Sequence, residues 1–357
     1  MNNSQPSALL RERSLQPLQS REKMLDILQN EIYGYLPPEP ENLHFTVESD
    51  IVNNFCAGKA TCHKITACGL LGGRPFSFPF YASFPSEERK YPFFVHINFR
   101  ENIPDQYQPT EELIDNGFAV LSFDYNGVTR DNDDFLDGLA GAFYPDGVRT
   151  STSDPGKIAL WAWAAHRVMD YAATRPDVLD LDCAIVCGHS RLGKTALLAA
   201  ATDTRFAFAY SNDSGCAGAS ITRGKQGETT ANICRRFPYW FCDNYKKYMD
   251  REYEMPFDQH FLVASIAPRK VLIGSAAEDW WADPLAEQLC CVAASPAFRR
   301  GFVCPDHVAA PGEAFLQGDI GYHLRKGLHY FSRTDWHRLM EFVRLHREER
   351  KAKQRNW

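Results

Sequence analysis

The stretch that most constrains the fold is residues 188–195, which read GHSRLGKT. In one interpretation, this stretch holds Ser190 on a sharp turn from a strand into a helix, where small residues allow the tight backbone. In the other, it matches the pattern G-x-x-x-x-G-K-[ST] of loops that cradle nucleotide phosphates. Both interpretations need an apolar strand before the turn and a helix after it. Residues 184–187 (AIVC) are typical of a buried strand, and residues 194–201 (KTALLAAA) are typical of a helix. The sequence therefore predicts a strand–turn–helix unit, whose chemistry the rest of the chain must decide.

Composition restricts the class of protein. The 357 residues are 44% hydrophobic and 24% charged, as in an ordinary globular chain. A net charge of -6 gives no basic surface for nucleic acid. No apolar run reaches the length of a membrane span, and the polar start at residues 1–6 is unlike a signal peptide. We therefore expect a cytoplasmic protein with neither a nucleic-acid nor a membrane partner.

Metal sites are not indicated. The eleven cysteines are odd in number and none are spaced C-x-x-C, which argues against zinc ribbons and redox pairs. Residues 131–134 (DNDD) hint at a calcium loop, but Leu136 stands where such a loop requires glycine. We expect a solvated turn there, free buried thiols, and no metal or cofactor.

The first third of the chain indicates a helix followed by hairpins. Residues 1–30 are expected to form an amphipathic helical extension, and residues 45–84 alternate β-rich runs with glycine turns, as in antiparallel hairpins. Residues 93–98 and 119–123 are near-continuous apolar strands, typical of a parallel sheet covered on both faces. A crossover helix is expected between them at residues 111–115.

The remainder continues the strand–helix alternation. Asp154 as N-cap and Pro155 at the first helical position predict a long helix leading to the strand before Ser190. Further strands are expected at residues 206–211 and 270–274. A last helix contains Trp336, Leu339, Met340 and Val343, and the charged tail 347–357 is expected to fray into solvent.

This alternation predicts an α/β fold: a three-layer sandwich with a mostly parallel, doubly wound central sheet and antiparallel strands at its N-terminal side. No repeat or linker divides the chain, so we expect one domain over residues 1–357.

The order of residues after Ser190 favours a hydrolase. On the α/β-hydrolase fold, the triad runs serine, then acid, then histidine. The apolar strand at 271–274 ends near Asp279, and His329 lies in a loop before the last helix. His323 lies in a strand-like run, so we place it beside the sheet. A phosphate loop usually opens its fold, whereas about half of the chain precedes this one.

The turn departs from the usual G-x-S-x-G pattern. Its second glycine is displaced by one position to Gly193, and Leu192 stands where glycine is expected. This weakens a generic esterase assignment and favours a more particular family.

Residues 188–194 (GHSRLGK) resemble the G-C-S-R-x-G-K nucleophile motif of the glucuronoyl esterases (carbohydrate esterase family 15), α/β hydrolases that cleave 4-O-methylglucuronoyl esters between xylan and lignin alcohols. The resemblance covers roughly residues 34–342. Other similar segments are 212–218 (NDSGCAG), 227–228 (GE), 237–241 (FPYWF), 258–260 (DQH), 267–269 (APR), 279–281 (DWW) and 335–336 (DW).

The resemblance implies roles for single residues. Ser190 would be the nucleophile, and Arg191 would support the oxyanion, which backbone N–H groups at a helix N-terminus also favour. Lys194, Glu228 and Trp281 would contact the sugar, although Trp281 could equally be a core residue.

The identity of the acid is left open. The resemblance places the family's glutamate on Asp213, whose side chain is one methylene shorter and so reaches less far toward the imidazole, whereas Asp279 lies where most α/β hydrolases keep their acid. We favour Asp279 and keep Asp213 as the alternative. His189 replaces the family's cysteine, and we expect no catalytic role for it.

The sequence thus predicts a serine carboxylic-ester hydrolase with a Ser-His-Asp triad, acting on glucuronoyl esters of small molecules or oligosaccharides. The alternatives are a carbohydrate O-acetyl esterase such as an acetylxylan esterase, a non-catalytic carbohydrate-binding relative, and a phosphate-loop nucleotide binder.

Overall fold

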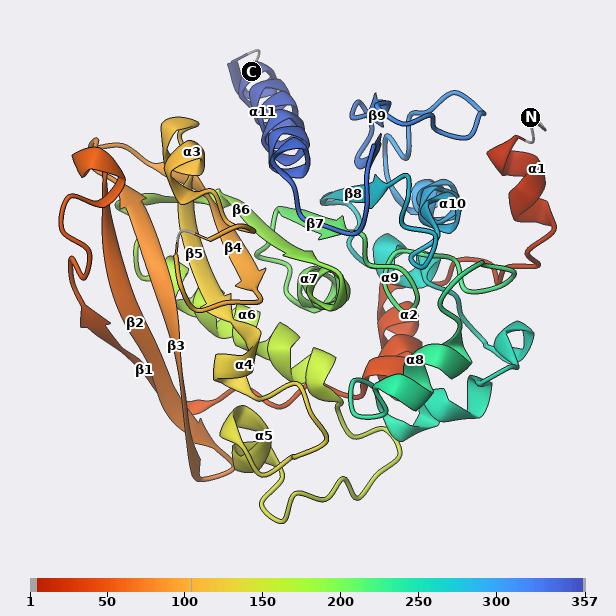
Figure 1. The fold of residues 1–357 in the computed structure, drawn as a ribbon, viewed down its shortest axis with the longest axis horizontal. Helices are drawn as coiled ribbons and strands as arrows, with labels where there is room; N and C mark the ends of the chain where they lie inside the picture. The colour runs from red at the N-terminus through yellow and green to blue at the C-terminus, as the bar shows by residue number, and fades with distance from the viewer. Residues whose placement is uncertain (1–4, 104, 356–357) are drawn as a thin grey trace.

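The computed structural model describes residues 5–103 and 105–355 (Figure 1). The strands are β1 (Glu41–Glu48), β2 (Ala60–Leu71), β3 (Arg74–Pro85), β4 (Tyr91–Asn98), β5 (Ala119–Asp124), β6 (Leu179–His189), β7 (Phe208–Asn212), β8 (Lys270–Ala276), β9 (Ala314–Phe315) and β10 (Ile320–Arg325). The α-helices are α1 (Pro6–Arg11), α2 (Arg21–Leu28), α3 (Thr110–Asp115), α4 (Tyr125–Val128), α5 (Gly138–Phe143), α6 (Lys157–Ala173), α7 (Arg191–Thr202), α8 (Thr230–Arg236), α9 (His260–Ala264), α10 (Pro284–Ala294) and α11 (Arg333–Arg355). Short π and 3-10 turns are η1 (Gln29–Tyr33), η2 (Phe55–Gly58), η3 (Asp243–Tyr248), η4 (Glu252–Glu254) and η5 (Ser295–Ala297).

The described strands form one mixed sheet in the order β1-β2-β3-β5-β4-β6-β7-β8-β10-β9. The central strands β5, β4, β6, β7, β8 and β10 run parallel to one another. The first three strands are antiparallel, as is the pairing of β3 with β5 and of β9 with β10. This arrangement confirms the predicted antiparallel N-terminal strands and mostly parallel centre.

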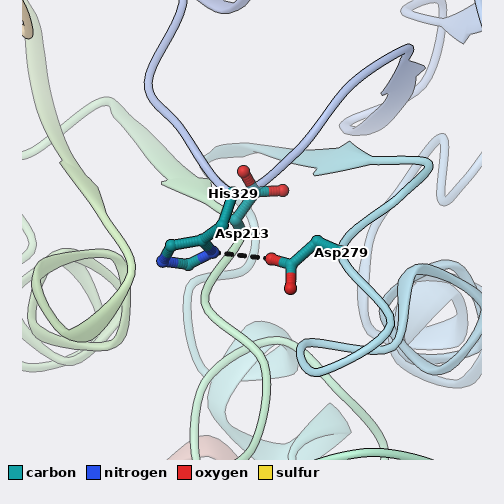
Figure 2. A group of neighbouring side chains, drawn as sticks. All are labelled: Asp213, Asp279 and His329. Carbon is teal, nitrogen blue, oxygen red and sulfur yellow. Dashed lines mark hydrogen bonds and ion pairs between the residues drawn. The ribbon is translucent and has the colours of Figure 1, made fainter.

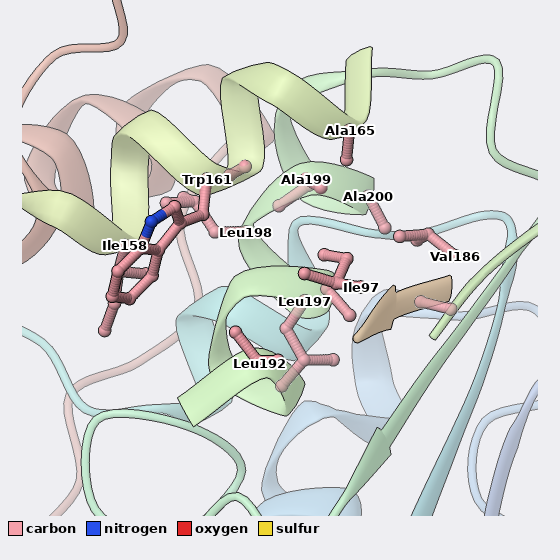
Figure 3. Packing of buried hydrophobic residues seen from close by; sticks show 14 of the residues in the cluster. Ile97, Ile158, Trp161, Ala165, Val186, Leu192, Leu197, Leu198, Ala199 and Ala200 are labelled. Carbon is pink, nitrogen blue, oxygen red and sulfur yellow. The ribbon is translucent and has the colours of Figure 1, made fainter. Parts of the chain in front are cut away.

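Successive residues of the central strands pack into two different cores. In β6, Ile185 belongs to a cluster with the α11 side chains Trp336 and Leu339, whereas Val186 belongs to the larger cluster beneath α6 and α7. Because side chains alternate across a strand, each strand must be apolar on both faces to be covered by helices on both sides. Figure 3 shows the α6–α7 side of this packing. The three-layer sandwich follows from this burial.

The N-terminal hairpin explains how the sheet extends beyond its parallel part. Leu71 pairs with Arg74, so β2 and β3 are joined by only two residues, Gly72 and Gly73. Both glycines have positive φ, 57° and 77°, as a tight hairpin turn requires.

Three predicted helix boundaries were wrong. The N-terminal extension is two helices, α1 and α2, separated by residues 12–20, and residues 1–4 lie outside the described part. Helix α6 begins at Lys157 with Gly156 as its N-cap, because the Asp154 carboxylate instead accepts hydrogen bonds from the backbone N–H groups of Thr150 and Ser151. The charged tail continues α11 as far as Arg355, with residues 356–357 outside the described part.

The topology gathers the predicted reactive residues at one edge. Ser190 follows β6, Asp213 follows β7, Asp279 follows β8, and His329 follows β10, four neighbouring strands of the sheet. Since parallel strands end at the same edge, these four residues meet outside their carboxyl ends. Among the described helices, none has the length and hydropathy needed to cross a bilayer.

Candidate active site

Ser190 occupies a strained turn between β6 and α7. Its backbone has φ 57° and ψ -126°, a conformation that side chains other than glycine rarely adopt. The Ser190 N–H donates to the carbonyl of Asn212 at 2.8 Å, which ties the turn to the end of β7. The turn ends one strand and begins the next helix within a single residue, and it places Ser190 on the wall of a cavity.

Two glycines allow this turn to close. A Cβ added to Gly188 would lie 2.2 Å from the carbonyl oxygen of Leu192, and one added to Gly193 would lie 2.9 Å from Ser211 Oγ. Leu192 itself is fully buried in the core under α7. This explains why the second glycine of the motif is displaced by one position. Position 192 faces the core and holds a large apolar side chain, whereas position 193 lies against β7 and has no room for a Cβ.

His329 is paired with Asp279. The two atoms His329 Nδ1 and Asp279 Oδ2 are 2.6 Å apart. A dashed line marks this interaction in Figure 2. The Asp279 carboxylate is 5% exposed, whereas the imidazole is 43% exposed at the cavity. When Nδ1–H donates to the carboxylate, the neutral ring keeps its lone pair on Nε2, the tautomer that a general base needs.

Asp213 has different partners. Its Oδ1 accepts from the N–H of Ala276 at 2.7 Å, and its Oδ2 accepts from Arg325 at 3.1 Å and from the N–H of Tyr330 at 3.4 Å. No hydrogen bond joins it to His329 among the described residues. Asp213 thus connects the end of β8 to the loop that contains His329, and the geometry favours Asp279 as the orienting acid.

These three residues do not make an open metal site. One ligand atom each from Asp213, Asp279 and His329 lies within 4.8 Å of the others. However, the Asp279–His329 bond uses the imidazole nitrogen, and the guanidinium of Arg325 already contacts Asp213. A cation placed there would compete with both interactions.

A cavity of about 340 Å³ brings all the predicted site residues together. The eight residues are Ser190, Arg191, Lys194, Asp213, Glu228, Asp279, Trp281 and His329. Sequence reasoning assigned no role to six further wall residues, which are Ser214, Gly215, Arg236, Phe237, Trp240 and Ala282. Phe237 and Trp240 stack with ring centroids 3.7 Å apart. Phe237 and Trp240 belong to the segment FPYWF, which sequence reasoning identified only as similar to the family. Nothing local in the sequence shows which aromatic rings face a cavity.

Arg191 lies among aromatic rings and pairs with Asp131. Its guanidinium carbon lies 4.6 Å from the centre of the Trp240 ring and 5.3 Å from that of Phe237. The Arg191 NH1 group donates to Asp131 Oδ2. The prediction of a solvated turn at residues 131–134 was therefore wrong at Asp131, whose side chain is 10% exposed. Its partners come from elements distant in sequence, which no local pattern reveals.

Lys194 is buried beneath the cavity wall. The residue is 3% exposed, and Nζ donates to the carbonyl of Ser214. Burial lowers the pKa of the Lys194 ammonium, while the nearby Glu228 opposes that shift. A phosphate-loop lysine must be free to reach phosphate oxygens. The position of Lys194 and the strained Ser190 turn both argue against the nucleotide interpretation.

Glu228 and Trp281 lie on the same side of the cavity. The Glu228 N–H donates to the carbonyl of Trp281 at 3.0 Å, and Glu228 is 8% exposed. Trp281 is 49% exposed, so it is not a core residue. Together they offer a carboxylate and a partly uncovered ring, the groups that bind sugar hydroxyls and sugar faces.

His189 packs directly against His329. Their ring centroids are 4.4 Å apart, and His189 Nδ1 lies 2.6 Å from Asn212 Oδ1. Burial lowers the pKa of His189 well below its ordinary value, and the neighbouring His329 lowers it further. A neutral His189 adds no second positive charge when His329 takes up a proton.

Comparison with known proteins gives the family. The sequence profile described as "Glucuronyl esterase, fungi" matches residues 71–300, more than half of the chain. The chain belongs to the glucuronoyl esterase family.

Two relatives differ in how much of their length is matched. Carbohydrate esterase MZ0003, from an unknown prokaryotic organism, is 40% identical over 240 residues, which are 66% of this chain and 55% of that protein. This chain thus spans about half the length of MZ0003. The 4-O-methyl-glucuronoyl methylesterase of Schizophyllum commune is 25% identical over 299 residues, 80% of this chain and 69% of that protein.

Solved structures of family members confirm the α/β-hydrolase fold. The glucuronoyl esterase from Solibacter usitatus has a TM-score of 0.81 at 30% identity, with 92% of each chain covered. A promiscuous CE15 esterase from a marine bacterial metagenome has a TM-score of 0.79 at 29% identity, with 91% of each chain covered.

The substitution Gly188→Ala tests whether the turn at Ser190 requires a residue without a Cβ. Because the added methyl meets the Leu192 backbone at 2.2 Å, the turn must open, and we expect a loss of about 3 kcal/mol or more in unfolding free energy. Denaturant titration measures it. Gly127→Ala is the matched control, since its Cβ would meet nothing closer than 3.8 Å. Equal unfolding midpoints for the two variants would contradict the steric argument.

Glu287 makes the free energy of unfolding depend on pH. This residue is fully buried, and its carboxylate accepts from Ser275 Oγ and from the N–H of Gly215. Burial raises the pKa of Glu287 from 4.5 to about 7. The neutral form is therefore favoured in the folded state, so its contribution to stability is complete below pH 4.5 and is lost as the pH rises through 7.

Glu287→Gln removes this ionisation while keeping the side-chain shape. We expect the unfolding free energy of the variant, relative to the native protein, to rise by about 3 kcal/mol between pH 4.5 and pH 7. Denaturant titrations at several pH values measure the difference. A difference that does not change with pH would show that Glu287 has the same pKa in the folded and unfolded states.

Proposed function

We propose that the protein is a serine carboxylic-ester hydrolase that acts on glucuronoyl esters, with Ser190, His329 and Asp279 as its triad. The observation that carries the proposal is the Asp279–His329 hydrogen bond on the wall of the cavity that Ser190 also lines. Family membership supports the same chemistry, and the relative from Schizophyllum commune has the name of a glucuronoyl methylesterase.

The first step transfers the Ser190 proton. His329 Nε2 accepts it while Oγ attacks the ester carbonyl, and the Asp279 carboxylate stabilises the imidazolium that forms. Because Nδ1 already contacts Asp279, the ring needs no change of tautomer before the attack.

The oxyanion forms beside the start of α7. The first N–H groups of a helix have no partner within the helix, and the helix dipole favours negative charge there. The guanidinium of Arg191 lines the same cavity, and the side chain is 24% exposed. One such donor contributes about 3 kcal/mol to transition-state stability.

The remaining steps reverse the first. His329 returns the proton to the leaving alcohol, and the acyl group stays on Ser190 Oγ. Water then attacks the acyl carbonyl while His329 takes its proton, and the acid and free Ser190 are released. Atoms and charges balance without a cofactor.

The polar wall favours a sugar acid as the acyl group. Lys194, Glu228 and Arg236 are charged residues of the cavity wall, and Trp281 offers a partly exposed ring. The volume of about 340 Å³ lies at the lower end of small-molecule sites. An acetyl group has no hydroxyl groups to pair with these charged side chains.

Asp279→Asn tests the acid. The amide can donate to Nδ1 and so leave the proton on Nε2, where it blocks the base; we expect kcat to fall by about 10³–10⁴-fold. Steady-state hydrolysis of benzyl glucuronate measures it. Glu278→Gln is the control, because this exposed neighbour loses its charge but keeps an oxygen for the Gly327 N–H. Asp213 would be the acid instead if Asp279→Asn kept native activity while Asp213→Asn lost it in a folded protein.

Fluorophosphonate labelling tests the proposed function as a whole. Mass spectrometry should place the label on Ser190 and find none in Ser190→Ala. We expect benzyl glucuronate to be hydrolysed with a higher kcat/KM than acetylated xylose or p-nitrophenyl acetate. Faster hydrolysis of acetylated xylose would make the protein an O-acetyl esterase. Sugar binding without labelling would make it a non-catalytic relative, and ATP–Mg²⁺ binding without labelling a nucleotide binder.

A further inference from the structure

Asp131 contacts Arg191, but it belongs to a part of the sequence far from the predicted triad residues. It lies in the loop between α4 and α5, about sixty positions before Arg191 in the chain. Its side chain is 10% exposed and that of Arg191 is 24% exposed, so the ion pair is largely withdrawn from solvent. Desolvated pairs of this kind hold their geometry more firmly than exposed ones.

The Asp131 carboxylate is itself fixed on both oxygens. Trp240 Nε1 donates to Oδ1 at 2.6 Å, and the Tyr125 hydroxyl donates to Oδ2 at 3.1 Å. The backbone is fixed too, since its N–H donates to Asn126 Oδ1 at 2.9 Å and its carbonyl accepts from the Tyr239 hydroxyl at 3.0 Å. Because both oxygens of this carboxylate are hydrogen-bonded, it can hold a flexible side chain that pairs with it in one orientation.

Arg191 has that flexible side chain and few other polar restraints. Among the described residues, its guanidinium has no other carboxylate partner; the remaining neighbours are the rings of Trp240, Phe237 and Phe99, at 4.6, 5.3 and 5.8 Å. Aromatic faces attract a guanidinium, but they do not determine how the group is rotated within its own plane. A carboxylate that accepts from NH1 does determine this rotation, because the N–H donors of the guanidinium have a rigid geometry.

Asp131 does not use the whole guanidinium of Arg191. It takes NH1, while the Arg191 side chain lines the cavity and stays 24% exposed. An oxyanion at Ser190 would form on the wall of the same cavity, where a guanidinium donor that Asp131 leaves free would find an acceptor.

We propose that Asp131 is a positioning residue for ester hydrolysis, which acts through Arg191 by fixing the guanidinium with its free donors toward the developing oxyanion. The inference rests on the proposed hydrolase function. Asp131 is not among the residues that line the cavity. Its effect therefore belongs to the transition state, where the oxyanion exists, rather than to binding of the neutral ester.

The test is a double-mutant cycle of Asp131→Ala and Arg191→Ala, with hydrolysis of benzyl glucuronate as the readout. We expect Arg191→Ala to lower kcat by about 10²–10³-fold and Asp131→Ala by about 10-fold or more, each with little change in KM. In the double variant, removing Asp131 should have no further effect on kcat. An equal loss from Asp131→Ala with and without Arg191, or no loss at all, overturns the proposal.

Two further variants keep the result interpretable. Asp133→Asn removes a charge from the same turn at an exposed position and should retain native kcat. Asp131→Asn preserves the shape but has one oxygen to face two sets of donors, so it should lose kcat even when its unfolding midpoint matches that of the native protein. A native kcat in this folded variant contradicts the proposal. Fluorophosphonate labelling of Ser190 in the native protein tests the hydrolase function separately; its failure would refute that function instead.

Discussion

The close approach of Gly188 to the backbone of Leu192 determines where the hydroxyl of Ser190 stands. Only without a Cβ can β6 turn so sharply into α7, with the carbonyl of Leu192 at 2.2 Å from the position a Cβ would take. Ser190 then adopts φ 57°, and the cost of this conformation is offset by the burial of α7. The same turn begins helix α7 at the cavity, so the Ser190 hydroxyl and the first N–H groups of the helix both depend on one backbone feature.

The two aspartates near His329 have different partners. Asp279 bonds the imidazole, whereas Asp213 bonds the N–H of Ala276, Arg325 and the N–H of Tyr330. Asp213 thereby holds the strand that precedes Asp279 and the loop that contains His329 in one arrangement. The imidazole is contacted from the end of β8, by Asp279, and not from the end of β7.

The sequence predicted what periodicity and chain order encode. The apolar central strands, their parallel order and the gathering of Ser190, Asp279 and His329 follow from alternation and topology. The start of α6 was missed because Asp154 bonds the backbone before the helix instead of capping it. Asp131 was missed because its partners, Arg191 and Trp240, lie 60 and 109 positions away. Roles of single residues stay predictions, since they depend on chemistry and not on the fold.

Helix α7 links the reactive turn to the interior. Beyond its first turn, Ala199 and Ala200 lie on the side of the helix that faces α6 and the sheet (Figure 3), and they are fully buried, as is the next residue, Ala201. Methyl groups this small let the two helices lie close, and they leave no flexible side chain to absorb a displacement. Any change of volume there would shift the helix as a rigid body, and Ser190, the residue just before its first, would move with it. The position of the Ser190 hydroxyl therefore depends on how well the interior behind the helix is packed.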